Sequence, residues 1–256
     1  MRRATLAVYR ALHRQARQLA KTAPVLHVRE PLDTAGLGRH QWSSDTAGWR
    51  KDALRDLLPG LLESPSQGSL SGSDVQACIR NNFRLGAGMT ESEEREQLLD
   101  LAFAALRVLS EQMHMAECSS TATTRDIFVE MTSMFTRKHT PETNLFLKPG
   151  DPPRYMFLYR CRIENCGTRR VRLLGRHWII EDRAGRKVEV PKGSAGVVGC
   201  TPILKPGDCF EYYSGTDLDT SQGTMRGSFQ MTFLDEANNP REDFDAEVAP
   251  FRLIGS

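Results

Sequence analysis

The sequence lacks any long hydrophobic run. None of its 256 residues lies in a stretch that approaches the roughly 18 apolar residues of a membrane-spanning helix, and the mean hydropathy is −0.44. Aromatic residues make up only 7%, yet 39% hydrophobic and 26% charged residues are proportions typical of globular proteins. A chain that crosses a bilayer by its own helix and a wholly disordered chain are therefore excluded. At roughly 100 to 200 residues a domain, the length predicts two domains.

Cysteine is scarce, and its spacing excludes two classes of site. The 6 cysteines are too few for a disulfide scaffold, and no two of them form a CxxC pair. The 6 histidines are not spaced as zinc ligands. We therefore expect reduced thiols, no metal site and no intrinsic cofactor.

Excess charge of either sign is also nearly absent. The 34 basic and 32 acidic residues leave a net charge of +2, so direct nucleic-acid binding is not expected. Residues 1–21, however, contain no acidic side chain. Five of their basic residues fall on one side of a helix, and we call them the basic stripe: Arg3, Arg10, Arg14, Arg17 and Lys21.

Hydrophobic periodicity predicts a helical first half, residues 1–118. Apolar residues recur at helical spacing before residue 24, again at residues 73–86 after a possible N-cap at Ser73, and again after Thr90. A Gly, Pro and Ser-containing insertion, about residues 24–72, separates the first two helices and holds a short predicted helix at residues 49–62. The pattern predicts a three-helix bundle.

The period changes from 3.6 to 2 in the second half. Residues 119–124 are Ser, Thr and Ala and are expected to form a linker, and residues 125–256 alternate apolar and polar positions between recurring turn signals. This spacing predicts an antiparallel β-sandwich of seven or eight strands. The whole chain is thus predicted to be an α+β multidomain protein.

Two short motifs mark the helical half. Val8-Tyr9-Arg10 lies near the start of the first helix, and Ile79-Arg-Asn-Asn-Phe83-Arg84 lies on a later one. With these motifs, residues 1 to about 117 resemble the LYR family of small mitochondrial three-helix proteins, named for a Leu-Tyr-Arg tripeptide. Val8 stands in place of the Leu, and the long insertion departs from the compact family pattern.

The resemblance implies that the helical half docks mitochondrial acyl-carrier protein, whose phosphopantetheine-linked acyl chain enters between the helices. Carrier proteins present an acidic helix, which a cationic stripe would attract. The implied site has Tyr9 and Phe83 lining the apolar interior and four arginines meeting acidic groups or the phosphate: Arg10, Arg14, Arg17 and Arg84. The alternative is that the two aromatics are ordinary core residues and that the stripe is a solvated helix face.

A basic, acid-free amphipathic N-terminus is also typical of a mitochondrial presequence. Because the Tyr9-Arg10 motif lies inside the same segment, we expect the segment to be retained in the fold. Both interpretations predict a mitochondrial location, in the matrix or at the matrix face of the inner membrane.

The second half contains a series of motifs in a fixed order. Among them are Tyr159-Arg-Cys-Arg-Ile-Glu-Asn165, Leu173-Leu-Gly-Arg-His-Trp-Ile-Ile180, Pro202-Ile-Leu-Lys-Pro-Gly207 and Gly223-Thr-Met-Arg-Gly227. In this order they are similar to the ApaG domain family. The resemblance implies a fibronectin-III-like β-sandwich that acts as a protein-interaction platform and brings no secure enzymatic activity.

Gly193-Ser-Ala-Gly196-Val-Val-Gly199 is a candidate anion-binding loop through Gly196 and Gly199. Members of the ApaG family often have GxGxxG here, but this chain has Ser194 at one of those glycines. A nucleotide fingerprint must also open a helix, whereas strands are predicted on both sides. Arg176-His177-Trp178 is expected to pack within a strand, and no catalytic residue is predicted.

Together these observations predict a non-enzymatic mitochondrial accessory or assembly protein. Its helical half would hold acyl-carrier protein, and its sandwich would contact respiratory complex I, another respiratory complex or the mitochondrial ribosome. An iron-sulfur cluster transfer or maturation adaptor is the alternative from another class. A nucleotide- or pyrophosphate-binding protein is a third hypothesis, which the glycine loop does not favour.

Overall fold

A computed structural model of the chain describes residues 2–22, 25–27, 32, 40–43, 69–89, 91–144 and 146–255. The chain forms two compact units, one made of Met1–Glu30 with Ala47–Ala116 and the other of Pro31–Thr46 with Glu117–Ser256. The structure differs in that residues 31–46, from the predicted insertion, join the second unit. The predicted helix at residues 49–62 and most of the insertion's path lie outside the described residues.

The first unit is helical. It contains α1 (Arg2–Thr22), α3 (Gly72–Ala87), α4 (Ser92–Glu117) and a small sheet of β1 (Val25–His27) with β3 (Ser69–Ser71). The N-cap of α3 is Ser71, two residues before the predicted Ser73: the Ser71 hydroxyl accepts a hydrogen bond of 3.1 Å from the Asp74 backbone N–H. Thr90, predicted to begin the third helix, lies outside the described residues.

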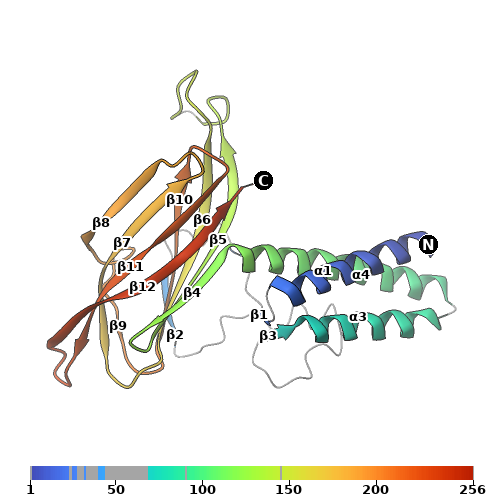
Figure 1. Ribbon diagram of the computed structural model, residues 1–256, viewed down its shortest axis with the longest axis horizontal. Coiled ribbons are helices and arrows are strands. Elements are labelled where there is room, and N and C mark those ends of the chain that lie inside the picture. The colour runs from blue at the N-terminus through green and yellow to red at the C-terminus, as the bar shows by residue number, and fades with distance from the viewer. Residues whose placement is uncertain are drawn as a thin grey trace. The chain divides into compact units, whose positions relative to one another are not determined.

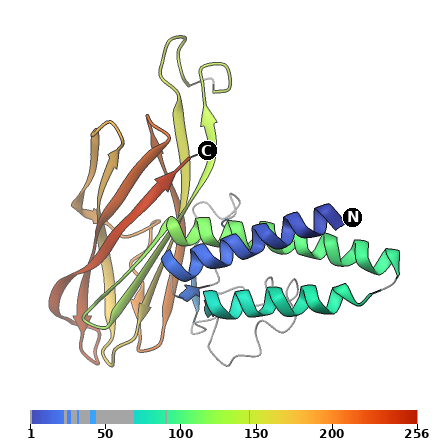
Figure 2. The same cartoon turned by 45° about the vertical axis from the view of Figure 1, so that its right-hand side comes forward.

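The three helices lie side by side (Figures 1 and 2). α1 and α3 are antiparallel, because Gly72 meets Ala20 at one end and Phe83 meets Tyr9 at the other. A Cβ atom on Gly72 would lie 2.6 Å from that of Ala20, so glycine is required for this close approach. The helical core is formed by Val8, Leu12, Ala16, Leu19, Val75, Cys78, Ile79, Ala105 and Leu109.

The second unit is an antiparallel β-sandwich of two five-stranded sheets. One sheet has the order β2-β10-β6-β5-β4, and the other has the order β12-β11-β7-β8 with β9 paired to β7. The strands are β2 (His40–Ser43), β4 (Ser119–Thr124), β5 (Ile127–His139), β6 (Arg154–Asn165), β7 (Val171–Asp182), β8 (Lys187–Ala195), β9 (Ile203–Leu204), β10 (Cys209–Leu218), β11 (Gln222–Leu234) and β12 (Pro240–Ile254).

Strands β5 to β12 correspond to the sandwich predicted from the alternation, and two further strands were not predicted. Residues 119–124 are not a linker but form β4, which pairs antiparallel with β5. The turn between these strands consists of Arg125 and Asp126, with φ of 51° and 65°. The polar Ser/Thr tract can form an edge strand because threonine is β-branched and fits an extended backbone. The other added strand, β2, comes from the insertion.

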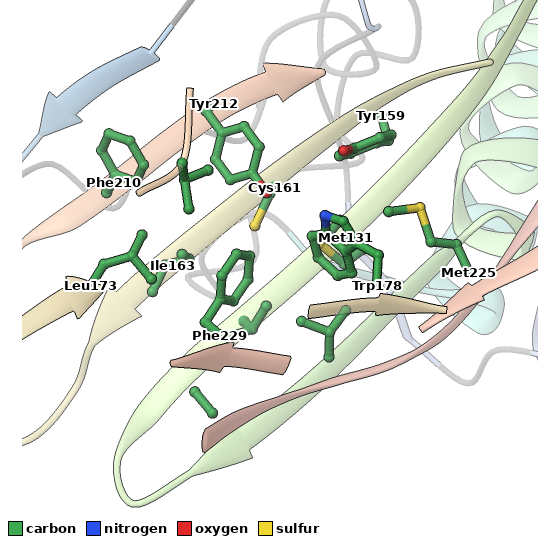
Figure 3. Packing of buried hydrophobic residues seen from close by; sticks show 14 of the residues in the cluster. Met131, Tyr159, Cys161, Ile163, Leu173, Trp178, Phe210, Tyr212, Met225 and Phe229 are labelled. Carbon is green, nitrogen blue, oxygen red and sulfur yellow. The ribbon is translucent and has the colours of Figure 1, made fainter. Parts of the chain in front are cut away.

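The sandwich core lies between the inner faces of the two sheets. Figure 3 shows Trp178 of β7 and Phe229 of β11 packed near Cys161 of β6. The Trp178 and Phe229 ring centroids are 5.3 Å apart in an edge-to-face arrangement. Val197, in the loop of Gly193–Gly199, belongs to the same core cluster.

Candidate functional site

The outward face of α1 carries a groove of about 610 Å³. Its lining residues are Tyr9, Arg10, His13, Arg14, Arg17, Gln18 and Lys21. The helix places them together because its apolar residues, including Val8 and Leu12, turn toward the helical core and leave the basic stripe in solvent. Three of the predicted site arginines, Arg10, Arg14 and Arg17, therefore lie on one concave surface.

An aromatic pair joins this groove to the helical core. The rings of Tyr9 and Phe83 are 4.9 Å apart and edge to face, and both side chains are half-buried against the core. The ring of His13 also lies edge to face with that of Tyr9, at 4.6 Å between ring centroids. Tyr9 and Phe83 thus lie where the polar groove meets the apolar interior.

The groove has a positive electrostatic environment. Burial lowers the pKa of His13, and the charges of Arg80 and Arg17 lower it further. Since cations on both α1 and α3 disfavour a further proton on His13, positive charge from two helices converges there. An anionic group bound at this position would relieve that repulsion.

At two residues of this region the structure differs from the sequence prediction. Arg84, a predicted site residue, is exposed on α3 but is not among the described residues that line the groove. Arg80, four residues earlier, was not predicted, although it acts on His13. Its position one helical turn before Arg84 in the Ile79–Arg84 motif was the signal that could have found it.

The glycine loop of the sandwich makes tight turns. Gly193, Gly196 and Gly199 have φ of 91°, 68° and 78°, which only glycine adopts readily. The N–H of Gly196 donates to the Leu174 carbonyl, at 2.8 Å. The N–H groups of Val197 and Cys200 each donate to the other residue's carbonyl. Since these donors are engaged within the protein, the loop's glycines are explained by its backbone conformation.

The Arg176-His177-Trp178 segment packs and hydrogen-bonds within the sandwich. Trp178 is buried in the core, and the Arg176 guanidinium donates to the Gly196 carbonyl at 3.0 Å. His177 Nε2 lies 2.8 Å from Glu189 Oε1. Each of the three side chains therefore has a structural contact that stabilises β7 or the glycine loop.

The buried thiols of the sandwich are poor nucleophiles. Burial raises the pKa of Cys118 to about 11 and that of Cys209 to about 12, so both remain protonated at neutral pH. Within the described ranges, no three His, Cys, Asp or Glu side chains are grouped so that they could hold a metal ion. Over the same ranges, no helix is both long and apolar enough to cross a membrane.

A row of charged residues is buried on the sandwich, which sequence alternation did not predict. Glu130, Arg162 and Glu211 are opposite one another on β5, β6 and β10, and each is at most 7% exposed. An ion pair of 3.5 Å joins Arg162 to Glu164 on the same strand. These positions alternate with core residues such as Cys161 and Ile163, so they belong to the outer face of the sheet.

The fold of the second half is that of an antiparallel β-sandwich domain, and the glycine turn lies within this domain. Residues 148–233 match the model of the ApaG domain. Protein ApaG of Paramagnetospirillum magneticum is 43% identical over 131 residues, which cover 51% of this chain and 89% of that protein. Protein ApaG of Methylobacillus flagellatus is 45% identical over 100 residues, covering 39% of this chain and 73% of that protein. The solved structure of an ApaA protein from Bordetella pertussis is 35% identical with a TM-score of 0.41, covering 52% of this chain and 97% of that one. The chain belongs to the ApaG family.

The predicted mitochondrial location is wrong. The relatives named ApaG come from bacteria, among them those of Methylobacillus flagellatus, Paramagnetospirillum magneticum and Thiobacillus denitrificans. The basic N-terminal segment that suggested a mitochondrial address forms α1, in which Leu12 and Ala16 are fully buried in the helical core. Without that location, the respiratory complexes and the mitochondrial ribosome lose their basis as host assemblies.

Proposed function

We propose that this ApaG-family chain is a non-catalytic adaptor whose helical half docks an acyl carrier protein and whose sandwich contacts a larger protein assembly. The groove on α1 is the observation that carries the proposal. It combines a row of exposed cations with an aromatic pair that leads to an apolar interior. A carrier protein offers the matching features: an acidic helix, a phosphate and an apolar acyl chain.

The groove has the size and chemistry of a docking site for a phosphopantetheine arm. A volume of about 610 Å³ lies within the roughly 300 to 1,000 Å³ of ordinary ligand pockets. In this proposal Arg10, Arg14 and Arg17 form charge-assisted hydrogen bonds with acidic side chains or with the phosphate. Arg80 adds to the positive field from α3.

The acyl chain would have to separate an existing contact. Tyr9 and Phe83 pack edge to face, and the core residues behind them are fully buried. Entry of a chain between the helices therefore costs the aromatic contact, about 0.5 to 1.5 kcal/mol beyond area burial, and returns apolar burial along the chain. Longer acyl chains should consequently bind more tightly than the bare holo carrier.

The charge part of the proposal is tested with a purified bacterial acyl carrier protein and the full-length chain. Arg10→Glu with Arg14→Glu should weaken binding measured by calorimetry at least about tenfold, because attraction becomes repulsion. Arg107→Glu, which reverses one charge at an exposed position of α4 outside the groove lining, is the charge-reversal control and should bind as the unmodified chain does. The proposal would be contradicted if the double variant bound the carrier protein as tightly as the unmodified chain, or if the unmodified chain did not bind it.

The partners of the sandwich are tested by cross-linking. Mass spectrometry of proteins cross-linked to the full chain in its host should recover an acyl carrier protein together with the subunits of one assembly. Recovery of cysteine desulfurase subunits in place of a carrier protein would favour the iron-sulfur adaptor. A chain with substitutions in the sandwich is cross-linked in the same way. If it recovers the carrier protein but not the assembly, the two contacts belong to different halves of the chain.

A further inference from the structure

The helical unit exposes large apolar side chains where α3 and α4 meet. Leu85 and Met89 are 74% and 36% exposed at the end of α3, and Leu101 of α4 is 43% exposed. The Met89 N–H donates to the Gly86 carbonyl at 3.3 Å, so the chain continues as a helical turn that carries Met89 to the side of Leu85. We call Leu85, Met89 and Leu101 the apolar seam.

The two helices turn their seam leucines to the same outer surface. α3 meets α1 through Phe83, and Leu85 comes two residues later, so it lies on the side of α3 away from α1. α4 meets α1 through Ser110, which accepts a hydrogen bond from the Gln15 amide. Leu101 comes about two and a half turns before Ser110 and therefore also lies on the side away from α1. The exposed leucines thus form one surface rather than isolated positions, and a surface of this kind is typical of a binding interface.

A close contact fixes the level of α3 against α4. A Cβ atom on Gly86 would lie 3.2 Å from Leu98 Cδ1, so these two residues are at one level of the bundle. The two helices run antiparallel, as Figures 1 and 2 show. Arg84 comes two residues before Gly86, and Asp100 comes two residues after Leu98. Arg84 and Asp100 therefore lie at the same level on the two helices that border the seam.

The two helices that border the seam carry opposite charges. The charged residues in the second half of α3 are Arg80 and Arg84, which are both exposed. Across residues 91–100 there is one basic residue, Arg95, and the acidic residues are all exposed: Glu91, Glu93, Glu94, Glu96 and Asp100. Over the described part of the chain, neither Arg84 nor Asp100 forms an ion pair. Both charges are therefore available to a partner.

We propose that the apolar seam is the interface of a homodimer, in which α3 of each copy packs against α4 of the other. A two-fold axis parallel to the helices sets each α3 opposite the other copy's α4 and leaves the levels unchanged. Arg84 of one copy then faces Asp100 of the other copy, and Leu85 packs against Leu101. The surface is self-complementary in charge and in apolar area, which favours a second copy of this chain over an unrelated partner.

The dimer interface goes beyond carrier docking. None of its residues lines the groove on α1. It also gives a role to Arg84, the arginine of the Ile79–Arg84 motif that the groove leaves out. The two surfaces lie on different sides of the bundle, because the seam turns away from α1.

Sedimentation equilibrium of the full-length chain tests the apolar part of the interface. The unmodified chain, 28.7 kDa as a monomer, should reach twice that mass as its concentration is raised. Leu85→Asp should raise the dissociation constant of the dimer at least about tenfold, because it buries a charge in the apolar contact. Leu85 is 74% exposed within one chain, so the helical core stays intact. Leu6→Asp, at a position 47% exposed on α1, is the matched control and should sediment as the unmodified chain does.

A charge exchange tests the pairing of α3 with α4. Arg84→Asp or Asp100→Arg alone sets like charges against each other at both contacts of the dimer, and each should weaken it at least about tenfold. Mixing the two single variants should restore dimerisation, because the aspartates of one variant then face the arginines of the other. Within each single variant the charges on α3 and α4 remain alike, so rescue by mixing reports contact between chains.

Three results would overturn the proposal. The first is an unmodified chain that remains a monomer at the highest concentration tested. The second is a dimer that neither Leu85→Asp weakens nor the mixed variants restore. The third is a monomer that sediments with anionic phospholipid vesicles and loses this binding in Leu85→Asp, because the seam would then contact a membrane. No carrier protein is present in these measurements, and a monomer that binds the carrier would leave the proposed function intact.

Discussion

At the scale of single residues, the glycine loop of the sandwich distinguishes a structural motif from a binding motif. All three glycines of Gly193–Gly199 have positive φ, but their surroundings differ. A Cβ atom on Gly196 would lie 2.6 Å from the Cys200 carbonyl oxygen, whereas one on Gly199 would meet nothing within 4 Å. The two positions therefore separate backbone strain from steric overlap.

Gly199→Ala should lower the free energy of unfolding by about 1 to 2 kcal/mol, the cost of a left-handed alanine. Gly196→Ala should cost about 1 to 3 kcal/mol more, because the turn must open to accept the methyl group. Urea denaturation measures both. Equal losses of unfolding free energy in the two variants would show that the steric overlap at Cys200 is relieved without cost.

The cysteines should react in the order of their exposure. Cys166 is exposed, whereas Cys118, Cys161 and Cys209 are buried. With a pKa raised to about 11, Cys118 has about one thiolate in a thousand at pH 8 and is also shielded from reagent. Iodoacetamide labelling followed by mass spectrometry should modify Cys166 first and Cys118 and Cys209 only on unfolding. Labelling of Cys209 in the folded chain would contradict the burial of β10.

At the scale of elements, α1 has two faces with separate roles. Val8, Leu12, Ala16 and Leu19 form the buried face, and the basic stripe forms the other. Helical spacing alone predicted this division, since i, i+4, i+8 positions share a side of a helix. What spacing could not predict is that Phe83 meets Tyr9, because that contact depends on the antiparallel docking of α3.

Leu12→Ala should destabilise the helical half by about 2 to 5 kcal/mol, because Leu12 is fully buried and its removal leaves a cavity. Leu6→Ala, at a position 47% exposed on the same helix, should change stability by less than about 0.5 kcal/mol. Thermal unfolding followed by circular dichroism at the helical signal compares the two. A loss at Leu6 as large as that at Leu12 would contradict the assignment of the buried face.

The alternation of apolar and polar residues predicts strands but not the burial of both of their faces. The period of two correctly predicted a sandwich, because β5 to β12 have one face in the core. It did not predict that Glu130, Arg162 and Glu211 would be buried on the outer face. A local pattern gives the two sides of a strand but not whether more of the chain covers the outer side.

At the scale of the whole molecule, the two units were predicted but their composition was not. Residues 31–46 belong to the same unit as the sandwich although they lie between two helical segments. Helix and strand patterns are local, whereas β2 pairs with β10, more than 160 positions later in the sequence. Such a pairing depends on the edge that the folded sandwich presents.

Residues 117–256 alone should fold, because half of this chain covers 89% of a relative. Without β2 they should unfold at a lower temperature than the sandwich of the full chain, since the β10 edge loses its partner. Thermal denaturation followed at the β-sheet signal measures both, and the full-length Gln41→Pro with Trp42→Pro variant is the control for β2 alone. An identical midpoint in all three would show that β2 contributes no stability.

Binding of an acyl carrier protein, as proposed, should weaken with ionic strength. The basic stripe is exposed, so salt screens its attraction over a distance that shrinks from about 10 Å at 0.1 M to about 3 Å at 1 M. Calorimetry at increasing sodium chloride should show a steady loss of affinity for the unmodified chain and a smaller loss for Arg14→Glu. Affinity independent of salt would exclude the basic stripe as the docking surface.

The sequence by itself determined the two structural classes, the basic face of α1 and the ApaG motifs, because each depends on residues close together in the chain. It did not determine that Ser119–Thr124 would become β4, that β2 would close the β10 edge, or that Glu130 and Arg162 would be buried. β4 depends on the tight turn at Arg125 and Asp126 that pairs it with β5. β2 depends on a partner strand more than 160 positions away, which accepts it through main-chain hydrogen bonds that leave little trace in the side-chain pattern. The tertiary structure therefore decided which segments pair at the edges of the sandwich.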